Sequence, residues 1–196
     1  NSAGIFHSIA RAAACMITQY PVDGARGVMV NTASADSTEG QMGQAAYSAA
    51  KAAINGMTLT IARDLAREAI RVNTIQRGIF HAPAMARATP LMLEALGNMV
   101  PFPPRLGRAE EYASMALEIV RNGYLNGEIV RLDGAIRMQP RWRQAPRGPL
   151  TGPRGVSLAR TQRRLGCGDL GLQPHRLAEV AAPRRGEQPL QGVLLH

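Results

Sequence analysis

Short apolar runs alternate with stretches of helical periodicity along residues 4–132, and this order limits the fold more than any other feature. Strand-like runs occupy residues 27–34, 70–75 and 127–132, and helical spacing covers residues 4–17, 44–68, 91–100 and 109–122. Parallel strands require crossover connections between them, so the order predicts an α/β fold built on a parallel sheet. Ligand sites in such sheets lie beyond the carboxyl ends of the strands.

The helix predicted over residues 44–68 is rich in alanine, the residue with the highest helix propensity. Its apolar stripe comprises Ala46, Ala50, Ala53, Met57, Ile61 and Leu65. A stripe at helical spacing indicates the face of a helix that packs against the rest of the protein. We therefore expect these side chains in the core.

Charge and composition change near Pro140. Residues 1–140 hold 13 basic and 11 acidic side chains and residues 141–196 hold 10 and 3, so the net charge of +9 divides into +2 and +7. The second segment is also rich in proline and glycine, as disordered segments are. We predict one domain over residues 1–140 and a disordered or irregular basic tail over residues 141–196.

Three interpretations of this tail are open. A basic segment can bind RNA, but Trp142 is the only aromatic residue of the tail, so nucleic acid is not favoured as a partner. The alternatives are a disordered extension and a translated non-coding or frameshifted stretch. We favour the last, because no periodicity follows Pro140.

The sequence offers no pattern for a disulfide framework, a metal site or a membrane span. Cys15 and Cys167 lie far apart without CxxC spacing, which favours two isolated thiols. The four histidines are scattered, so we expect no metal. No apolar run approaches the roughly 18 residues that cross a bilayer, so we expect no membrane partner.

Tyr47 and Lys51 are four residues apart on the helix predicted over residues 44–68, so both side chains project from one face. A phenol is a poor base at neutral pH, but a neighbouring ammonium favours its ionised form. Lys51 is also the single lysine of a chain with 22 arginines. Its compact charge suits a ribose hydroxyl better than a broad guanidinium does. The pair indicates acid/base chemistry, although YxxxK spacing alone also occurs by chance.

Ser34 stands 13 residues before Tyr47, at the carboxyl end of a predicted strand. There its hydroxyl can donate to a substrate carbonyl and hold it against the phenol. A serine in an ordinary turn is the alternative interpretation. The strand-end position supports a substrate-binding role.

Several stretches resemble the catalytic half of the short-chain dehydrogenase/reductase family. They are NTAS at residues 31–34, GQMGQAAYSAAK at 40–51, residues 71–73, VPFPPRLG at 100–107 and GEIVRLDGA at 127–135. The resemblance covers residues 1 to about 140 and is strongest to members that act on 3-hydroxyacyl-CoA or hydroxysteroids. It implies the C-terminal half of a doubly wound, Rossmann-like parallel sheet. It also implies an NAD-dependent oxidoreductase that interconverts a secondary alcohol and a ketone.

The resemblance assigns roles to four residues. Tyr47 is the general acid/base, Lys51 tunes it, and both contact the nicotinamide ribose side of NAD. Ser34 polarises the substrate oxygen. Asn1, in the NSAG helix start, matches the fourth catalytic residue of the family, which places a water molecule beside the lysine.

The chain also departs from the family at the cofactor site. Gly78 and Phe80 match cofactor-binding positions, but Arg77 replaces a proline and Ala82 replaces a threonine, which weakens the inferred nicotinamide contacts. The glycine-rich phosphate-binding turn of the family belongs upstream of Asn1. We therefore expect the 196 residues alone to be inactive and one edge of the sheet to be unpaired.

The resemblance further implies a substrate loop, an oligomer and a compartment. Residues 83–104 occupy the substrate-loop position, and their helical spacing suits either covering an acyl chain or ordinary packing. A homotetramer is implied by the small residues of the helix that bears Tyr47, namely Gly43, Ala45, Ala49, Ala52 and Ala53. The expected compartment is mitochondrial for a eukaryotic protein and cytoplasmic for a bacterial one.

A second hypothesis belongs to a different class of function. Arg77, Ala82 and the missing cofactor half are also compatible with a non-catalytic scaffold or pseudoenzyme subunit of the same fold. NAD binding separates this hypothesis from the enzyme.

Overall fold

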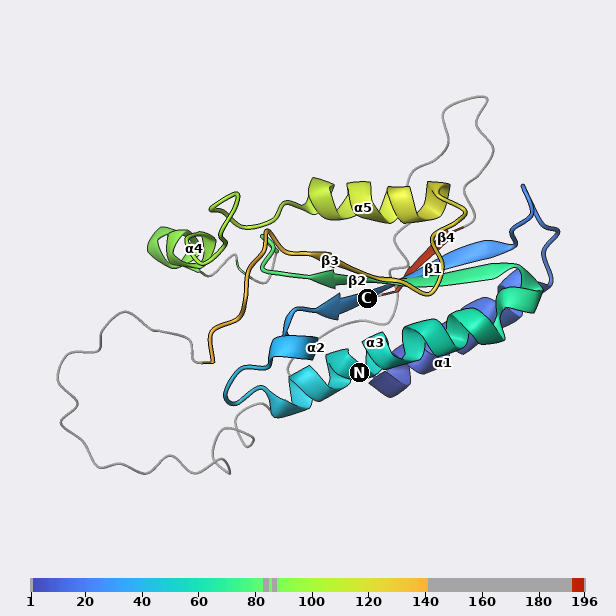
Figure 1. The fold of residues 1–196 in the computed structure, drawn as a ribbon, viewed down its shortest axis with the longest axis horizontal. Helices are drawn as coiled ribbons and strands as arrows, with labels where there is room; N and C mark the ends of the chain where they lie inside the picture. Colours follow the sequence, from blue (N-terminus) through green and yellow to red (C-terminus); the bar gives the residue numbers. More distant parts are fainter. Residues whose placement is uncertain (1, 83–84, 86–87, 141–191, 196) are drawn as a thin grey trace. The chain divides into compact units, whose positions relative to one another are not determined.

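The computed structural model describes residues 2–82, 85, 88–140 and 192–195, in which helices alternate with parallel strands (Figure 1). The elements are α1 (Ser2–Ile17), β1 (Gly27–Ser34), α2 (Asp36–Glu39), α3 (Ala45–Asp64), the 3₁₀ turn η1 (Ala66–Glu68), β2 (Ile70–Arg77), α4 (Pro90–Gly97), α5 (Ala109–Arg121), β3 (Ile129–Leu132) and β4 (Gly192–Leu195). The predicted α/β class is confirmed. The short helix α2 and the strand β4 were not predicted.

The four described strands form one parallel sheet in the order β3-β2-β1-β4. β1 and β2 pair over all eight of their residues, which aligns Ser34 with Arg77. β3 pairs with the end of β2 and aligns Leu132 with Arg77. The carboxyl ends of these three strands therefore meet at one edge of the sheet.

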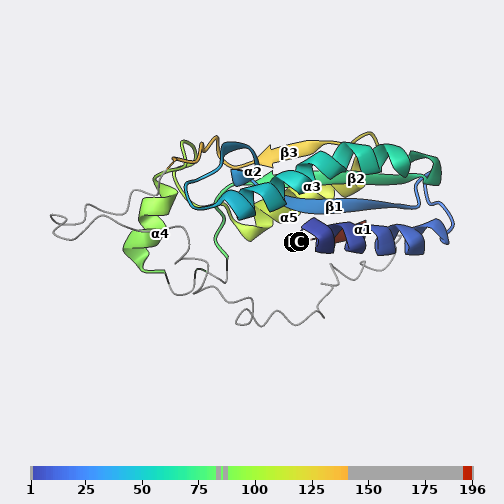
Figure 2. The ribbon, with the colours of Figure 1, turned by 90° about the horizontal axis from the view of Figure 1, so that it is seen from below.

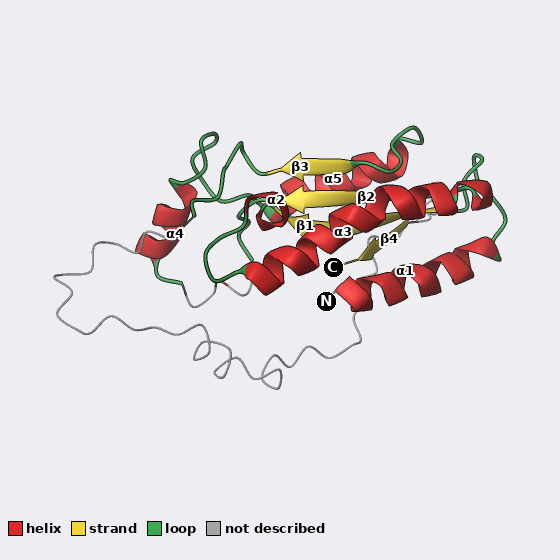
Figure 3. Cartoon of the chain, turned by 60° about the horizontal axis from the view of Figure 1, so that its bottom comes forward, coloured by secondary structure: helices red, strands yellow, loops and turns green. Residues whose placement is uncertain are grey.

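Helices cover both faces of the sheet. In Figure 1, α5 lies above the strands, and α1 and α3 lie below them. Figures 2 and 3 show α1 and α3 side by side on the same face of the strands. The core on this face comprises Ile5, Ile9, Ala13, Met16, Met29, Ala33, Ile54, Ile61, Ala62, Ile70 and Val72. The core under α5 comprises Val28, Val30, Ile75 and Ile119.

Two local features explain how the helices dock. A Cβ at Gly27, where β1 begins, would lie 2.7 Å from the Met16 sulfur, so a glycine lets the end of α1 approach the sheet. At the other face, Arg71 of β2 donates to the carbonyls of Ile119 and Val120 at 2.8 and 2.9 Å. These are unpaired carbonyls of the last turn of α5, where a cation is favourable.

The second half of the predicted apolar stripe of α3 lies in the core, where Ile61 is buried and Met57 and Leu65 pack against it. The buried residues of α3 are Ile54, Thr58, Ile61 and Ala62, whereas Ala46 is exposed. Thr58 is tolerated in the core because its hydroxyl donates to the Ile54 carbonyl at 2.8 Å and lies 2.6 Å from the Thr74 hydroxyl. The stripe prediction is therefore wrong for Ala46, in the first turn of α3.

The expectation of an unpaired sheet edge is also wrong. β4 lies parallel to β1 and pairs along it from Val28↔Gly192 to Asn31↔Leu195. Backbone N–H and C=O groups at a sheet edge need partners, and any extended segment can supply them. A four-residue apolar run has too little periodicity to be recognised as a strand in advance.

Candidate active site

Ser34 ends β1 and is held by the turn that enters α2. The Asp36 N–H donates to the Ser34 hydroxyl oxygen at 3.3 Å. The Ser37 hydroxyl donates to the Ser34 carbonyl at 2.6 Å. Ser34 is half-buried, and its own hydroxyl hydrogen has no acceptor among the described residues. It remains available to a ligand at the edge of the sheet.

Lys51 reaches the same strand from α3. Its ammonium donates to the Thr32 carbonyl at 2.9 Å, two residues before Ser34. Two of its three hydrogens therefore remain for a ligand. Burial, and then the positive charge of Arg77, hold the pKa of Lys51 below its usual value.

Tyr47 lies one helical turn before Lys51, and its side chain is 36% exposed. Helices and strands of this sheet run in opposite directions, so the start of α3 lies at the carboxyl edge. Four helical residues rise about 6 Å, and two strand residues rise about 6.6 Å. With Lys51 level with Thr32, Tyr47 is therefore level with Ser34. Ser34 and Lys51 thus lie at the same end of β1, and the helix and strand rises place Tyr47 at that end as well.

A layer of amides and hydroxyls lies behind these residues. Asn55, one turn after Lys51, donates to the Ser37 hydroxyl at 2.8 Å and to the Gln76 amide oxygen at 3.1 Å. Gln76 in turn donates to the Thr38 hydroxyl at 2.9 Å. The layer connects α3 and β2 to the turn that holds Ser34. Asn55 was not among the predicted site residues, although its spacing of four from Lys51 places both on one helix face.

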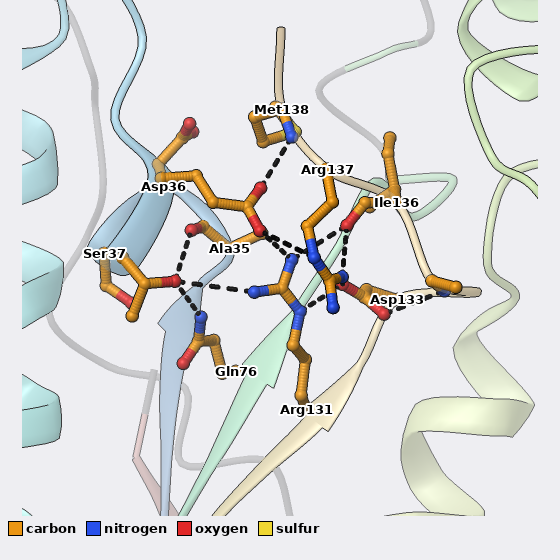
Figure 4. Close-up of polar contacts among 12 residues, drawn as sticks. Ala35, Asp36, Ser37, Gln76, Arg131, Asp133, Ile136, Arg137 and Met138 are labelled. Atoms are coloured by element: carbon orange, nitrogen blue, oxygen red, sulfur yellow. Dashed lines mark hydrogen bonds and ion pairs between the residues drawn. The ribbon is translucent and has the colours of Figure 1, made fainter.

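A separate group of charges lies at the end of β3, and we call Glu39, Arg131, Asp133 and Arg137 the paired cluster (Figure 4). Arg131 forms ion pairs with Glu39 and Asp133. Arg137 lies 3.5 Å from a carboxylate oxygen of each. Glu39 also accepts the Met138 N–H at 2.6 Å. The paired cluster thus joins α2 to the segment after β3.

Gly78 and Phe80, the predicted cofactor-binding residues, lie just beyond β2. A Cβ at Gly78 would lie 2.6 Å from the Asp133 Cβ, so this position requires glycine. The Phe80 ring is buried and meets the Tyr112 ring edge-on at 6.2 Å. The Tyr112 hydroxyl lies 2.6 Å from that of Thr32. The Phe80 ring is therefore part of the packing under α5, and Gly78 is the more exposed candidate for cofactor contact.

The remaining predicted positions are described only in part. Asn1 lies outside the described residues. Within the substrate-loop region, α4 begins at an N-cap in which the Thr89 hydroxyl accepts the Met92 N–H at 3.3 Å. Leu91 and Met92 are 74% and 52% exposed, whereas Leu96 is buried. The helix thus anchors itself by one face and leaves an apolar face open, as a covering helix requires.

Other kinds of site find less support. A cavity of about 1170 Å³ lies along α5, but Ser34, Tyr47 and Lys51 do not line it. In the described part of the chain, no cluster of three or more His, Cys, Asp or Glu could hold a metal. No helix among the described residues is long and apolar enough to cross a bilayer.

Comparison with known proteins agrees with this geometry. A family model described as Enoyl-(Acyl carrier protein) reductase matches residues 1–136. The chain belongs to the short-chain dehydrogenase/reductase family. It is 49% identical to 3-hydroxyacyl-CoA dehydrogenase type-2 of Drosophila melanogaster and 51% identical to the Homo sapiens protein of that name, each over 141 residues.

These alignments cover 71% of this chain and 55% and 54% of the two relatives. The crystal structure of 3-hydroxyacyl-CoA dehydrogenase type-2 from Mycobacterium avium matches with a TM-score of 0.64 and 45% identity, over 68% of this chain and 53% of that one. The chain thus spans about half the length of the relatives it matches.

Proposed function

We propose that the protein is an NAD-dependent oxidoreductase that interconverts a secondary alcohol and a ketone, with a 3-hydroxyacyl-CoA or a hydroxysteroid as substrate. The hydrogen bond from Lys51 to the Thr32 carbonyl carries the proposal, because it brings the YxxxK face of α3 to the strand end that bears Ser34. The 3-hydroxyacyl-CoA dehydrogenase names of the relatives support the substrate class.

Each residue has a distinct part in the proposed reaction. In reduction, Tyr47 donates its phenolic proton to the carbonyl oxygen, and in oxidation it takes the alcohol proton back. Lys51 stabilises the phenolate that Tyr47 becomes. Ser34 donates a hydrogen bond to the same oxygen and fixes its position. The nicotinamide, when bound, supplies or accepts the hydride.

The described residues fit the nicotinamide end of NAD. Lys51 has two hydrogens free for the ribose hydroxyls. Its half-buried side chain is held at the Thr32 carbonyl by the third hydrogen. Gly78 lies half-buried just beyond β2, and we propose that its backbone borders the nicotinamide ring. The pyrophosphate needs a glycine-rich turn, and no TGxxxGxG motif occurs in the 196 residues. We therefore propose that these residues alone do not turn over substrate.

NADH binding tests the enzyme against the scaffold hypothesis. We expect saturable binding by the full-length protein, followed by NADH fluorescence, that Lys51→Ala weakens. Absence of binding would support a non-catalytic scaffold, for which the half-buried Arg77 at a nicotinamide-contact position is the supporting observation.

A tyrosine pair tests the chemistry. Tyr47→Phe should lower the rate of acetoacetyl-CoA reduction by about 100-fold or more, since it removes the proton donor. Tyr124→Phe is the matched control, because this tyrosine is 99% exposed and outside the site. Equal activity of the two variants would exclude Tyr47 as the acid/base.

We also propose a homotetramer in which α3 contributes to a subunit interface. Gly43, Ala45 and Ala49 are exposed at or beside the start of α3, which leaves small residues free for close helix packing. Mass photometry of the full-length protein should show four subunits. Ala49→Arg should shift the distribution toward smaller species.

A further inference from the structure

Arg77 occupies the sheet edge beside Ser34, and its backbone is fixed on both sides. The Arg77 carbonyl accepts the Ala35 N–H at 2.9 Å, and the next N–H, of Gly78, donates to the Leu132 carbonyl at 2.9 Å. Successive strand side chains point to opposite faces. The Gln76 side chain points to α3, where Asn55 donates to it, so the Arg77 side chain leaves β2 on the α5 side.

The charge of Arg77 acts on groups of both helical layers. After burial, Arg77 is the second cause that lowers the pKa of Lys51 on α3. On α5, burial raises the pKa of Tyr112, while the hydrogen bond to Thr32 and the charge of Arg77 oppose that rise. The register Ser34↔Arg77 places the residue from which this charge extends at the carboxyl edge of the sheet.

Arg77 has no anionic partner among the described residues. Glu39 and Asp133, two carboxylates of the same sheet edge, are engaged by Arg131 and Arg137. Arg77 is half-buried as a residue, and a charged group that loses water without gaining a counter-charge is unfavourable in a folded protein. Together with Lys51, Arg77 supplies positive charge beside Ser34 that no carboxylate of the described residues pairs with.

We propose that Arg77 is an oxyanion-binding residue of this site and holds a carboxylate or phosphate of the bound ligand at the carboxyl edge of the sheet, beside Ser34. The planar guanidinium fork matches such groups through two parallel hydrogen bonds. The proposal deepens the proposed function, because Ser34 and Tyr47 define where the reacting carbon lies. The oxyanion has two possible sources, a carboxylate of the substrate or a phosphate of the cofactor.

Two substrates that differ only in charge separate these sources. Acetoacetate is an anion, and methyl acetoacetate has the same carbonyl without the charge. If the substrate supplies the oxyanion, Arg77→Gln lowers kcat/KM for acetoacetate by about 10- to 100-fold. It changes kcat/KM for methyl acetoacetate by no more than about twofold. Arg77→Lys should recover part of the loss.

The cofactor arm uses the same variants. If the cofactor supplies the oxyanion, Arg77→Gln weakens NADH binding and lowers kcat/KM for both substrates by the same factor. Arg63→Gln is the matched control, since Arg63 is exposed near the opposite end of α3 from Tyr47. Unchanged NADH affinity together with an unchanged ratio of the two substrates overturns the proposal.

A binding measurement keeps the proposal separate from the enzyme activity. Because Lys51 is the single lysine, reductive methylation with ¹³C labels one side chain besides the α-amino group. Titration of the labelled protein with acetoacetate or inorganic phosphate, without cofactor, should move this NMR signal saturably. Arg77→Gln should abolish the shift while the circular dichroism spectrum is retained. If no ketone is reduced, the proposed function fails and this titration still decides the role of Arg77.

Discussion

The residues at the ends of β1 and β2 differ from the paired cluster at the end of β3 in how their charges are balanced. Lys51 contacts a backbone carbonyl, and Arg77 has no partner among the described residues. In the paired cluster, Arg131 meets two carboxylates and the Ile136 carbonyl. Both groups stand at the carboxyl edge of the same sheet, on neighbouring elements.

This difference in charge balance distinguishes residues that bind a ligand from residues that stabilise the fold. A cation whose partners are all protein groups stabilises the fold and has little left to offer a ligand. A half-buried cation with free donors destabilises the folded protein, and binding of an anion or a hydroxyl offsets that loss of stability. We therefore assign ligand chemistry to Lys51 and Arg77, and a structural role to Arg131.

Lys51→Met should have the largest effect on activity of the substitutions that test this difference. We expect kcat/KM to fall by about 100-fold or more, since both phenolate stabilisation and ribose binding are lost. The urea midpoint should stay unchanged or rise, because burial already disfavours the ammonium, as its lowered pKa indicates. Lys51→Arg is the control for charge alone and should remain impaired. A large loss of stability with normal turnover would reverse the assignment.

Glu39→Gln should show the opposite pattern. It leaves Arg131 with one carboxylate and weakens the contact to the Met138 N–H, so we expect the free energy of unfolding to fall by about 2 kcal/mol. Glu94→Gln, at an exposed site on α4, should change it by less than about 0.5 kcal/mol. Urea titration measures both. Equal effects would mean that the paired cluster contributes nothing specific.

Gly78 lies between the two groups and tests how closely they are joined. Gly78→Ala should destabilise the protein by about 1 to 2 kcal/mol, because the new Cβ would lie 2.6 Å from the Asp133 Cβ and 2.9 Å from its Cα. Gly56→Ala is the matched control on α3. Its Cβ would meet nothing within 4 Å, and alanine favours a helix, so stability should rise by about 0.5 to 1 kcal/mol. The two variants should therefore differ in sign.

The smallest effect concerns an exposed ion pair outside both groups. Arg105 forms hydrogen bonds to both carboxylate oxygens of Glu111, at 2.9 and 2.6 Å. These bonds, followed by that from the Arg108 N–H, lower the pKa of Glu111 from 4.5 to about 2. The pair's contribution to stability is therefore present above pH 4.5 and is lost as the pH falls through about 2.

NMR titration of the Glu111 carboxyl measures this directly. Arg105→Gln should raise its pKa toward 4.5, while the urea midpoint at neutral pH changes little because exposed pairs are screened by water. An unchanged titration in the variant would show that the pair does not form in solution.

Local periodicity was enough to predict most elements of the described residues. The strand predicted over residues 27–34 matches β1, and the helix predicted over residues 109–122 matches α5 within one residue. The site trio was also predictable, because a spacing of four on a helix and a position at a strand end are local facts. The catalytic roles of Ser34, Tyr47 and Lys51 stay predictions, as does that of Asn1.

The contacts that complete the site could not be predicted in this way. Asn55 meets Gln76 across 21 residues, and Arg131 meets Glu39 across 92. A pattern that repeats every two or four residues carries no information at such separations. Whether Arg77 has an ion-pair partner depends on which arginines the fold places against Glu39 and Asp133.

By itself, the sequence determined the α/β class, the helix that carries Tyr47 and Lys51, and the family. These follow from burial patterns and spacings within single elements. Only the tertiary structure decided that β4 pairs with β1, that Lys51 contacts Thr32, and that Arg77 stands without an anion beside Ser34. Strand pairing and ion pairing select among many chemically equivalent partners, and only the packed chain brings one of them within reach.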